Sequence, residues 1–365
     1  MEKLNVAILG ATGAVGQRFI QLLENHPWFQ VGEVVASGRS AGRPYGEAAN
    51  WVLDGEPPAR IANLTVKSLD AELSSVLVFS ALPKEAAEIR ELELAGAGHI
   101  VCTNASAHRM AEDVPLLLPE VNADHISLIE VQRHNRSWSG ALIANSNCTA
   151  MPVVMALAPL RKYQPKRLHI VSEQAVSGAG YPGVASLDIL DNVVPYVPGD
   201  EEKLQTETLK MLGQFDGERI HALDTITGAT CTRVPVVDGH LVNISLELGE
   251  QPTLEEMIAD WETFIGPDLV SYLPSAPARP LEYLRQVDRP QPRRDRNAGN
   301  GMATSIGRLR PCPILGYKFA ALSHNTIRGA AGCSILNAEL LAIKGYLGAF
   351  QPHLEAMVDS VIAHS

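Results

Sequence analysis

Short apolar runs alternate with helical stretches over the first third of the chain. Residues 4–9 form an apolar run that passes through closely spaced glycines into residues 15–23, where apolar side chains recur at helical spacing. A helical stretch at residues 83–95 and further apolar runs follow at residues 31–37, 75–82 and 99–104. Strands that alternate with helices through short links build parallel sheets. The pattern therefore predicts an α/β fold that begins with a Rossmann-like, doubly wound domain.

The pattern changes after about residue 135. Apolar and polar residues alternate at residues 167–178, 230–237 and 240–249, which is typical of a sheet with one covered face. We therefore expect a second domain of the α+β type. The expected boundaries are residues 1–146 for the first domain and 147–328 for the second, with a C-terminal helix at about 329–365 that returns to the first.

Composition agrees with two folded domains. The chain has 365 residues, of which 46% are hydrophobic and 19% charged, which is more than one core usually serves and enough apolar surface to order the chain. Its net charge of −11 disfavours nucleic acid and anionic membranes as partners. The start of the chain has no pattern of a secretory signal, so we expect a cytoplasmic protein.

Two local features qualify this picture. The five cysteines are an odd number, widely spaced and without a C-x-x-C pair, so neither a disulfide framework nor a metal site is expected. Residues 273–313 hold seven prolines and eight arginines against three acidic residues. With Tyr283 as its single aromatic residue, this basic segment favours an ordered but irregular arm that packs on a domain or subunit neighbour over a nucleic-acid contact.

The segment GATGAVG places Gly10, Gly13 and Gly16 between the first strand and the first helix. Glycines permit a tight turn and a close backbone approach, and a helix N-terminus offers free N–H groups to a pyrophosphate. The spacing predicts a dinucleotide site. A glycine-rich turn that only joins a strand to a helix is the alternative.

The residues after the second strand indicate which dinucleotide binds. NAD sites usually have an acidic residue there for the ribose 2′-hydroxyl, whereas this chain has Ser37, Arg39 and Ser40 and no acid before Glu47. Hydroxyl and guanidinium groups suit a 2′-phosphate, so we predict NADP. In the alternative interpretation, Arg39 is an ordinary solvated charge.

Three residues in the second half could carry chemistry. Cys148 lies between a polar Asn-Ser-Asn turn and an apolar helical run, where a helix dipole favours a thiolate. Arg233 and His240 lie seven positions apart; a guanidinium can hold a carboxylate, and a histidine can act as a general base. A buried structural cysteine and a surface histidine remain the alternatives.

Seven motifs cover nearly the whole chain in this order: GATGAVGQ, NSNCTA, EQAVSGAGYPG, ETLK, TCTRVPVVDGH, DRNAGNGM and SHNTIRGAAG. As a set, they resemble the aspartate-β-semialdehyde dehydrogenase family, in the variety typical of archaea and fungi. One position departs from the pattern, because Ser146 stands where relatives usually have proline, which loosens the turn before the cysteine.

The resemblance implies a role for each matching position. Cys148 would be the nucleophile, Gln174 would orient the bound intermediate and His240 would be the general acid/base. Arg233 would bind the substrate α-carboxylate and Glu207 its α-ammonium, while Lys210 and Arg109 would bind phosphate. The cofactor-binding residues implied are Gly10, Thr12, Gly13, Ala14, Val15, Ser37, Arg39, Ser40, Ser177, Gly178 and Asn325.

The implied activity is the NADP-dependent, reversible reductive dephosphorylation of aspartyl phosphate to aspartate semialdehyde through a cysteine thioester. It serves the synthesis of lysine, threonine and methionine, and the family forms dimers and tetramers through the second, catalytic domain. A malonyl-CoA or succinyl-CoA reductase of the same fold is one alternative. A Cys-His hydrolase or acyl transferase, or a non-catalytic nucleotide sensor, is an alternative of another class.

Overall fold

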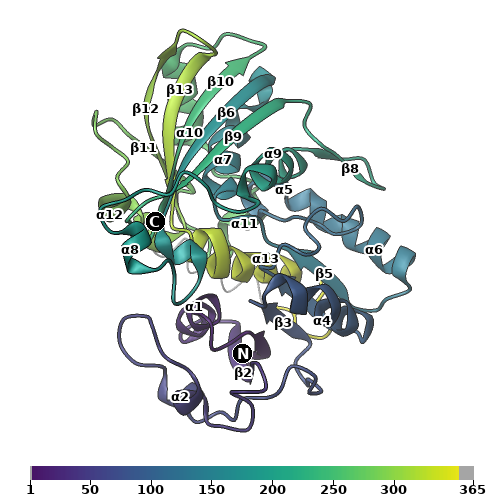
Figure 1. The fold of residues 1–365 in the computed structure, drawn as a ribbon. Helices are drawn as coiled ribbons and strands as arrows, with labels where there is room; N and C mark the ends of the chain where they lie inside the picture. The colour runs from purple at the N-terminus through teal and green to yellow at the C-terminus, as the bar shows by residue number, and fades with distance from the viewer. Residues whose placement is uncertain (1, 353–365) are drawn as a thin grey trace, which may run out of the picture.

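A computed structural model describes residues 2–352, and its strands form two large sheets (Figure 1). The first sheet is entirely parallel, in the order β2-β1-β3-β4-β5. Its strands are β1 (Leu4–Leu9), β2 (Phe29–Val35), β3 (Leu77–Ser80), β4 (Ile100–Thr103) and β5 (Ala141–Ala144). The longer helices that follow its strands are α1 (Ala14–Leu23), α4 (Lys84–Gly96) and α6 (Leu128–Arg136).

Among these elements, the sequence pattern revealed neither the helix α6 nor the strand β5. The four residues of β5 lie in a long uncharged stretch in which they neither alternate nor stand apart from the apolar helix that follows. The four strands and two helices expected in this part are present, with ends displaced by a few residues.

The second sheet has six strands in the order β11-β12-β13-β10-β6-β9. They are β6 (Pro165–Gln174), β9 (Ile226–Arg233), β10 (His240–Leu248), β11 (Leu281–Leu284), β12 (Thr304–Cys312) and β13 (Gly316–Ser323). Three helices lie along it: α7 (Ala150–Leu157), α9 (Asp200–Met211) and α10 (Leu254–Thr263). The helix α7 is buried along its whole length and packs against β10 and β13.

The basic segment at residues 273–313 is more regular than expected. It contributes β11 and β12, which form one edge of the second sheet, so the expectation of an irregular arm is wrong. Within it Arg289 pairs with Asp295, and Arg285 pairs with Glu262 of α10. The parallel pairing of β11 with β12 requires a long connection, and this connection takes up much of the proline-rich sequence.

The chain returns to the first sheet after β13. A π-helical turn at Ile327–Ala331 and the buried helix α13 (Gly332–Ile343) pack against α1 and β4. Figure 1 shows α13 running between the two sheets. A helix was expected at about 329–365, but α13 ends at Ile343 and residues 344–352 form turns and irregular structure; residues 353–365 lie outside the described residues.

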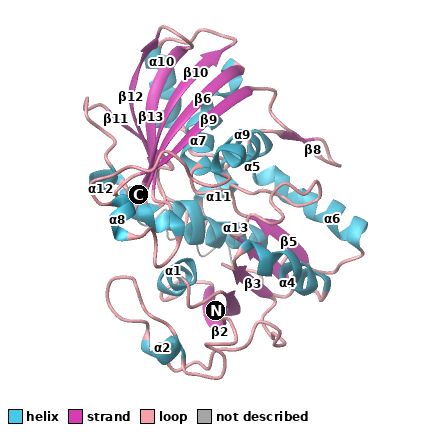
Figure 2. Ribbon diagram, viewed as in Figure 1, coloured by secondary structure: helices cyan, strands magenta, loops and turns pink. Residues whose placement is uncertain are grey.

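The remaining elements are short. The short helices are α2 (Tyr45–Ala48), α3 (Ala59–Ala62), α5 (Pro119–Asn122), α8 (Ser186–Ile189), α11 (Asp268–Ser271) and α12 (Pro292–Asp295), and a hairpin joins β7 (Gln214–Phe215) to β8 (Ile220–His221). Figure 2 shows strands gathered in the two sheets and helices around and between them, which confirms the expected α/β class with a second, mixed-sheet part.

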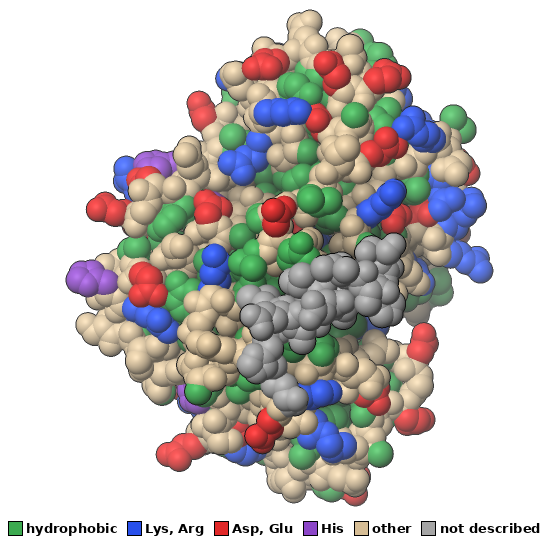
Figure 3. Space-filling model, turned by 180° about the vertical axis from the view of Figure 1, so that it is seen from behind, with side chains coloured by type: hydrophobic (Ala, Val, Ile, Leu, Met, Phe, Trp, Pro, Cys, Tyr) green, Lys and Arg blue, Asp and Glu red, His purple; other side chains and the backbone are tan. Residues whose placement is uncertain are grey.

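The distribution of charged side chains on the surface and the lengths of the helices are consistent with the charge and hydrophobic content of the sequence. The face seen in Figure 3 carries acidic and basic side chains interspersed, without a continuous basic patch. Within residues 2–352, no helix is long and apolar enough to cross a membrane.

Candidate active site

A cavity of about 650 Å³ lies where the carboxyl ends of the first sheet meet the second sheet. Ligands of doubly wound sheets bind at this edge, because the loops and helix N-termini after the strands converge there. The cavity brings together many of the residues expected to act in one site. Those that line it are Val15, Arg109, Cys148, Gln174, Ser177, Gly178, Arg233 and Asn325.

Cys148 lies in the turn between β5 and α7. The helix begins at Ala150, and the side-chain Oδ1 of Asn147 accepts hydrogen bonds from the backbone N–H groups of Thr149 (2.7 Å) and Ala150 (3.2 Å). This side chain caps the helix, so the turn is held even though Ser146 replaces the usual proline.

The thiol of Cys148 differs from the expectation of a favoured thiolate. Desolvation by the surrounding protein raises the pKa of the thiol to about 11, and Asp200 adds to the increase, whereas Arg109 and Arg233 oppose it. Because α7 starts two residues later and an acidic side chain lies near, the helix terminus does not offset the effect of burial on the thiol pKa of Cys148.

Three of the expected residues lie at one end of three neighbouring strands. Gln174 ends β6 and is paired with Arg233, which ends β9. His240 begins β10, the strand on the other side of β6. The spacing of seven residues between Arg233 and His240 therefore spans the turn from one side of β6 to the other.

The ring of His240 is held in one orientation. Its Nδ1 accepts a hydrogen bond from the backbone N–H of Ala175 at 3.0 Å, so the neutral ring carries its proton on Nε2. This Nε2 has no partner within residues 2–352 and lies beside Gly178, where an added Cβ would be 3.0 Å away. Burial lowers the pKa of His240 to about 3, so the neutral imidazole is the form at pH 7.

Arg233 is also buried and oriented. One of its N–H groups donates to the backbone oxygen of Ala175 at 2.8 Å, and burial lowers the pKa of the guanidinium. Arg233 and His240 thus both bind the backbone of residue 175, which follows Gln174.

The helix α9 presents Glu207 and Lys210 to the segment after β4. The Glu207 carboxylate pairs with Arg109 at 3.1 Å and accepts the backbone N–H of Asn147 at 2.7 Å. The Lys210 ammonium donates to the backbone oxygens of Arg109, Ala111 and Val114, each at 2.8 Å. Burial lowers the pKa of Lys210 to about 8.

These contacts differ from the roles expected of this pair. An ammonium has three N–H donors, and those of Lys210 are all taken by the backbone, so in this structure Lys210 offers none to a phosphate. Neither Glu207 nor Lys210 lines the cavity, whereas Arg109 does. The pair holds the segment after β4 in place, and the buried guanidinium of Arg109 is the cation of this segment that lines the cavity.

The glycine turn after β1 is shaped for a nucleotide. A Cβ on Gly10 would lie 2.5 Å from the backbone oxygen of Ala81, and one on Gly16 would lie 2.3 Å from that of Gly10. Gly13 is the N-cap of α1, and Thr12, Ala14 and Val15 complete the turn, so the first N–H groups of the helix are free of side-chain caps. The turn fits a pyrophosphate.

The loop after β2 holds the residues expected to select NADP. Ser37 and Arg39 are exposed and Ser40 is partly exposed, and the backbone N–H of Ser40 donates to the oxygen of Ser37 at 2.9 Å. No ion pair within the described chain includes Arg39.

Asn325 joins the cofactor side of the cavity to the loop before His240. Its Nδ2 donates to the Ser177 hydroxyl at 2.8 Å, and its Oδ1 accepts the backbone N–H of Gly239 at 2.8 Å. Together these contacts fix Ser177, Gly178 and the start of β10 relative to one another.

Sequence reasoning missed three residues of this site. Gly329 leaves space for Cys148, because a Cβ on residue 329 would lie 2.6 Å from the Cβ of Cys148. Gln17 holds the glycine turn through the backbone oxygen of Thr12, and Asp200 binds the side chain of Gln174. Gly329 and Gln17 belong to motifs that the sequence shows, whereas Asp200 lies outside them, and the partners of all three are distant in the chain or out of reach of the motif pattern.

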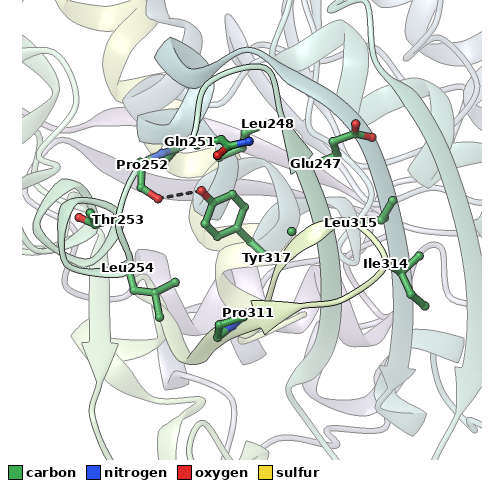
Figure 4. Close-up of a pocket in the computed structure, with 11 residues that line it drawn as sticks. Glu247, Leu248, Gln251, Pro252, Thr253, Leu254, Pro311, Ile314, Leu315 and Tyr317 are labelled. Carbon is green, nitrogen blue, oxygen red and sulfur yellow. Dashed lines mark hydrogen bonds between the residues drawn. The ribbon is translucent and has the colours of Figure 1, made fainter.

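A second cavity, shown in Figure 4, lies at the far end of the second sheet. Its only tyrosine, Tyr317, donates to the backbone oxygen of Pro252, and Glu247 pairs with Arg167. With its acid and its phenol already engaged, this cavity has no comparable set of reactive groups. Within residues 2–352, no cluster of three histidine, cysteine or acidic side chains could hold a metal ion.

Comparisons with known proteins agree with this geometry. Two family models match: semialdehyde dehydrogenase, NAD binding domain, at residues 5–129, and semialdehyde dehydrogenase, dimerisation domain, at residues 157–328. The fold and the site thus define a semialdehyde dehydrogenase.

The relatives narrow the class. Aspartate-semialdehyde dehydrogenase of Archaeoglobus fulgidus is 46% identical over 93% of this chain and 98% of its own length, and that of Schizosaccharomyces pombe is 42% identical over 94% and 99%. A crystal structure of the Candida albicans enzyme with NADP has a TM-score of 0.86 and 38% identity, covering 94% of this chain and 100% of its own. The chain belongs to the aspartate-semialdehyde dehydrogenase family, as the motifs predicted.

Proposed function

We propose that this chain catalyses the NADP-dependent, reversible conversion of aspartyl phosphate to aspartate semialdehyde and phosphate through a thioester on Cys148. The observation that carries the proposal is the single cavity that joins Cys148, Gln174 and Arg233 to the cofactor-side residues Ser177 and Asn325. A substrate carbon on Cys148 lies beside the place where a nicotinamide would bind, as hydride transfer requires.

In the oxidative direction, the Cys148 sulfur attacks the aldehyde carbon and forms a thiohemiacetal. Bound NADP, held by the glycine turn after β1 and by Ser177 and Asn325, would supply a hydride acceptor beside this carbon, and loss of the hydride together with the hydroxyl proton would leave a thioester. Phosphate then attacks the thioester carbon, and the Cys148 sulfur leaves as aspartyl phosphate forms. In the reverse direction the thioester is reduced to the aldehyde.

His240 contributes through its Nε2–H. The neutral ring can donate this hydrogen to the substrate oxygen as negative charge develops on it, which stabilises the tetrahedral intermediates. For His240 to accept a proton at Nε2, the ring must first lose the proton that Nε2 carries and take one up at Nδ1, which releases the Ala175 N–H. The general acid/base role therefore includes a change at both ring nitrogens.

The charges of the cavity suit a substrate with two anionic ends. Arg233 and Arg109 both line the cavity and are both about 7% exposed. Arg233 would bind the α-carboxylate next to Gln174, and Arg109 would bind the phosphate. The buried guanidinium of Arg233 has no ion pair within residues 2–352 and favours a substrate with a carboxylate, since buried charges require partners, whereas Arg109 would share its charge between Glu207 and the phosphate.

Residues 1–146 would bind NADP and residues 147–328 would provide catalysis and the subunit contact of a cytoplasmic homodimer or homotetramer. The apolar side chains exposed on the segment 181–196 support this: Leu187 is 90% exposed and Leu190 64%. Val194 in the same segment exchanges backbone hydrogen bonds with Arg233. We expect Leu187→Asp with Leu190→Asp to lower the mass measured by light scattering to that of a monomer.

An absorbance assay of NADPH tests the activity. Aspartate semialdehyde, phosphate and NADP together should produce NADPH, and omission of any one should stop the reaction. Cys148→Ser should reduce the rate at least about 1,000-fold, because an unactivated hydroxyl is a far weaker nucleophile. NADPH oxidation with malonyl-CoA or succinyl-CoA, and none with aspartyl phosphate, would contradict the proposal in favour of a CoA-thioester reductase.

A further inference from the structure

The first turn of α9 places the carboxylate of Asp200 in the cavity, and Asp200 lies outside the sequence motifs. Asp200 lines the cavity and is 6% exposed. It lies seven residues before Glu207, which places both carboxylates on one face of α9. Glu207 holds the backbone of Asn147, so two carboxylates of the same helix face reach the turn that carries Cys148.

Each oxygen of Asp200 accepts a side-chain amide. Its Oδ2 accepts Nε2 of Gln174 at 3.0 Å, and its Oδ1 accepts Nδ2 of Asn147 at 3.2 Å. Lys203 donates to the same Oδ1 at 2.9 Å and balances the charge. An amide side chain has an acceptor end and a donor end of nearly equal shape, so an acidic neighbour determines which end faces which way.

The orientation has a consequence for each amide. With Nε2 of Gln174 on Asp200, its Oε1 is directed away from Asp200 and is the end available to a group bound in the cavity. With Nδ2 of Asn147 on Asp200, its Oδ1 is the end that caps α7 through Thr149 and Ala150. Reversal of either amide would place an N–H₂ group where the site uses an oxygen.

We propose that Asp200 is a positioning residue for the reaction, which fixes the amide orientation of Gln174 and of Asn147 on either side of Cys148. This inference rests on the proposed function, because it assigns Gln174 a place beside the bound intermediate. Asp200 does not touch the reacting atoms; it acts through the two amides and through its charge on the thiol.

The first test is Asp200→Asn, which keeps the shape but supplies one oxygen where the site uses two. One of the two amides then faces another N–H₂ group, so kcat for aspartate semialdehyde should fall about 10- to 100-fold while its KM changes less than about threefold. Glu202→Gln is the matched control, because Glu202 is an exposed acid on the same helix, and its kcat should not change. Melting temperature and NADPH binding report whether each variant is folded.

A double variant shows whether Asp200 acts through Gln174. If it does, Asp200→Asn and Gln174→Ala are not independent, and the loss in the double variant is at least about threefold smaller than the product of the single losses. A merely structural contribution of Asp200 to α9 would give losses that multiply, and that result would overturn the inference.

The thiol provides a readout that needs no turnover. Removal of the negative charge of Asp200 should lower the thiol pKa, so iodoacetamide should alkylate Cys148 severalfold faster at pH 8 in Asp200→Asn than in the wild type or Glu202→Gln. An unchanged rate, or a kcat within twofold of wild type in folded Asp200→Asn, would refute the role of Asp200. Failure of the proposed function would appear instead as a wild type that is inactive with aspartate semialdehyde.

Discussion

Two regions of the site differ in how their charged side chains are paired. One is the nucleophile pocket, which consists of Cys148 and the residues packed around it, and the other is the loop after β2. In the pocket, charged side chains are buried and already have partners: Glu207 holds Arg109 and the backbone before Cys148, and Lys210 holds three backbone oxygens. Burial without such partners would be strongly unfavourable, so these residues form a single network.

The loop at residues 37–40 has none of this support. Ser37 and Arg39 extend into solvent, and within the described chain no acid pairs with Arg39. The pocket is organised before any ligand binds, whereas the loop gains partners from the ligand itself. Substitutions in the pocket should therefore alter chemistry and stability, and substitutions in the loop should alter the affinity for the cofactor alone.

The largest expected effect is the pH dependence of Cys148 alkylation. With a thiol pKa of about 11, the thiolate fraction rises tenfold for each pH unit below that value. The iodoacetamide rate at Cys148 should therefore increase about 1,000-fold between pH 7 and pH 10, as followed by peptide mapping. A small free thiol, measured in parallel, should level off near pH 9. A plateau for Cys148 below pH 8 would show that the helix terminus outweighs burial.

The next effect concerns the space around the nucleophile. In Gly329→Ala the new Cβ would lie 2.6 Å from Cβ and 2.9 Å from Cα of Cys148, so the turn must shift. We expect kcat to fall at least about 100-fold, because small displacements of a nucleophile have large effects on rate. Gly228→Ala is the control, since a Cβ there meets only an ordinary contact with His169. Near-normal kcat in Gly329→Ala would mean that the turn tolerates displacement.

The sequence predicts the pocket's chemistry better than its contacts. Cys148, Gln174, Arg233 and His240 each lie in a motif, and the ends of the neighbouring strands β6, β9 and β10 bring the last three together. The partner of Lys210 could not be foreseen, because it is the backbone of a segment about 100 residues earlier. Residue type indicates what a side chain can bind, and only the fold determines what it meets.

The same limit applies to the fold. Four strands of the first sheet were predictable because they alternate with helices, whereas β5 could not be distinguished within an uncharged stretch. The strands β11 and β12 could not be predicted because their segment is rich in proline and arginine. The sequence favours a thiolate at Cys148, whereas burial in the fold raises the thiol pKa. A helix terminus is visible in sequence, but the burial of Cys148 and the approach of Asp200 are tertiary effects.

Glu207→Gln should lower activity less than Gly329→Ala does. It also tests whether Glu207 acts through Arg109 and Asn147 or binds the α-ammonium of the substrate. The change removes the charge partner of buried Arg109, so we expect unfolding free energy to fall by about 3 kcal/mol in urea titrations. kcat/KM should fall about 10- to 100-fold for aspartate semialdehyde and for succinate semialdehyde, which lacks the amino group, because Glu207 acts through Arg109 and Asn147. A loss confined to the amino substrate would instead place the α-ammonium on Glu207, as the family resemblance implies.

The smallest expected effect is a change in NADP affinity on substitution in the exposed loop. It contrasts with the pocket, where substitutions should alter kcat and stability. Arg39→Ala removes a guanidinium that would meet the 2′-phosphate in solvent, where a charge-assisted contact is worth about 1.5 kcal/mol, or about tenfold in affinity. We therefore expect the Kd of NADP to rise about tenfold, with NAD binding, kcat and melting temperature unchanged. Arg43→Ala, a neighbouring exposed arginine, should leave both cofactors unaffected. Equal weakening of NADP and NAD, measured by calorimetry, would show that Arg39 supports the loop rather than the phosphate. A drop in kcat would show that the loop is coupled to the pocket, contrary to the separation of the two regions.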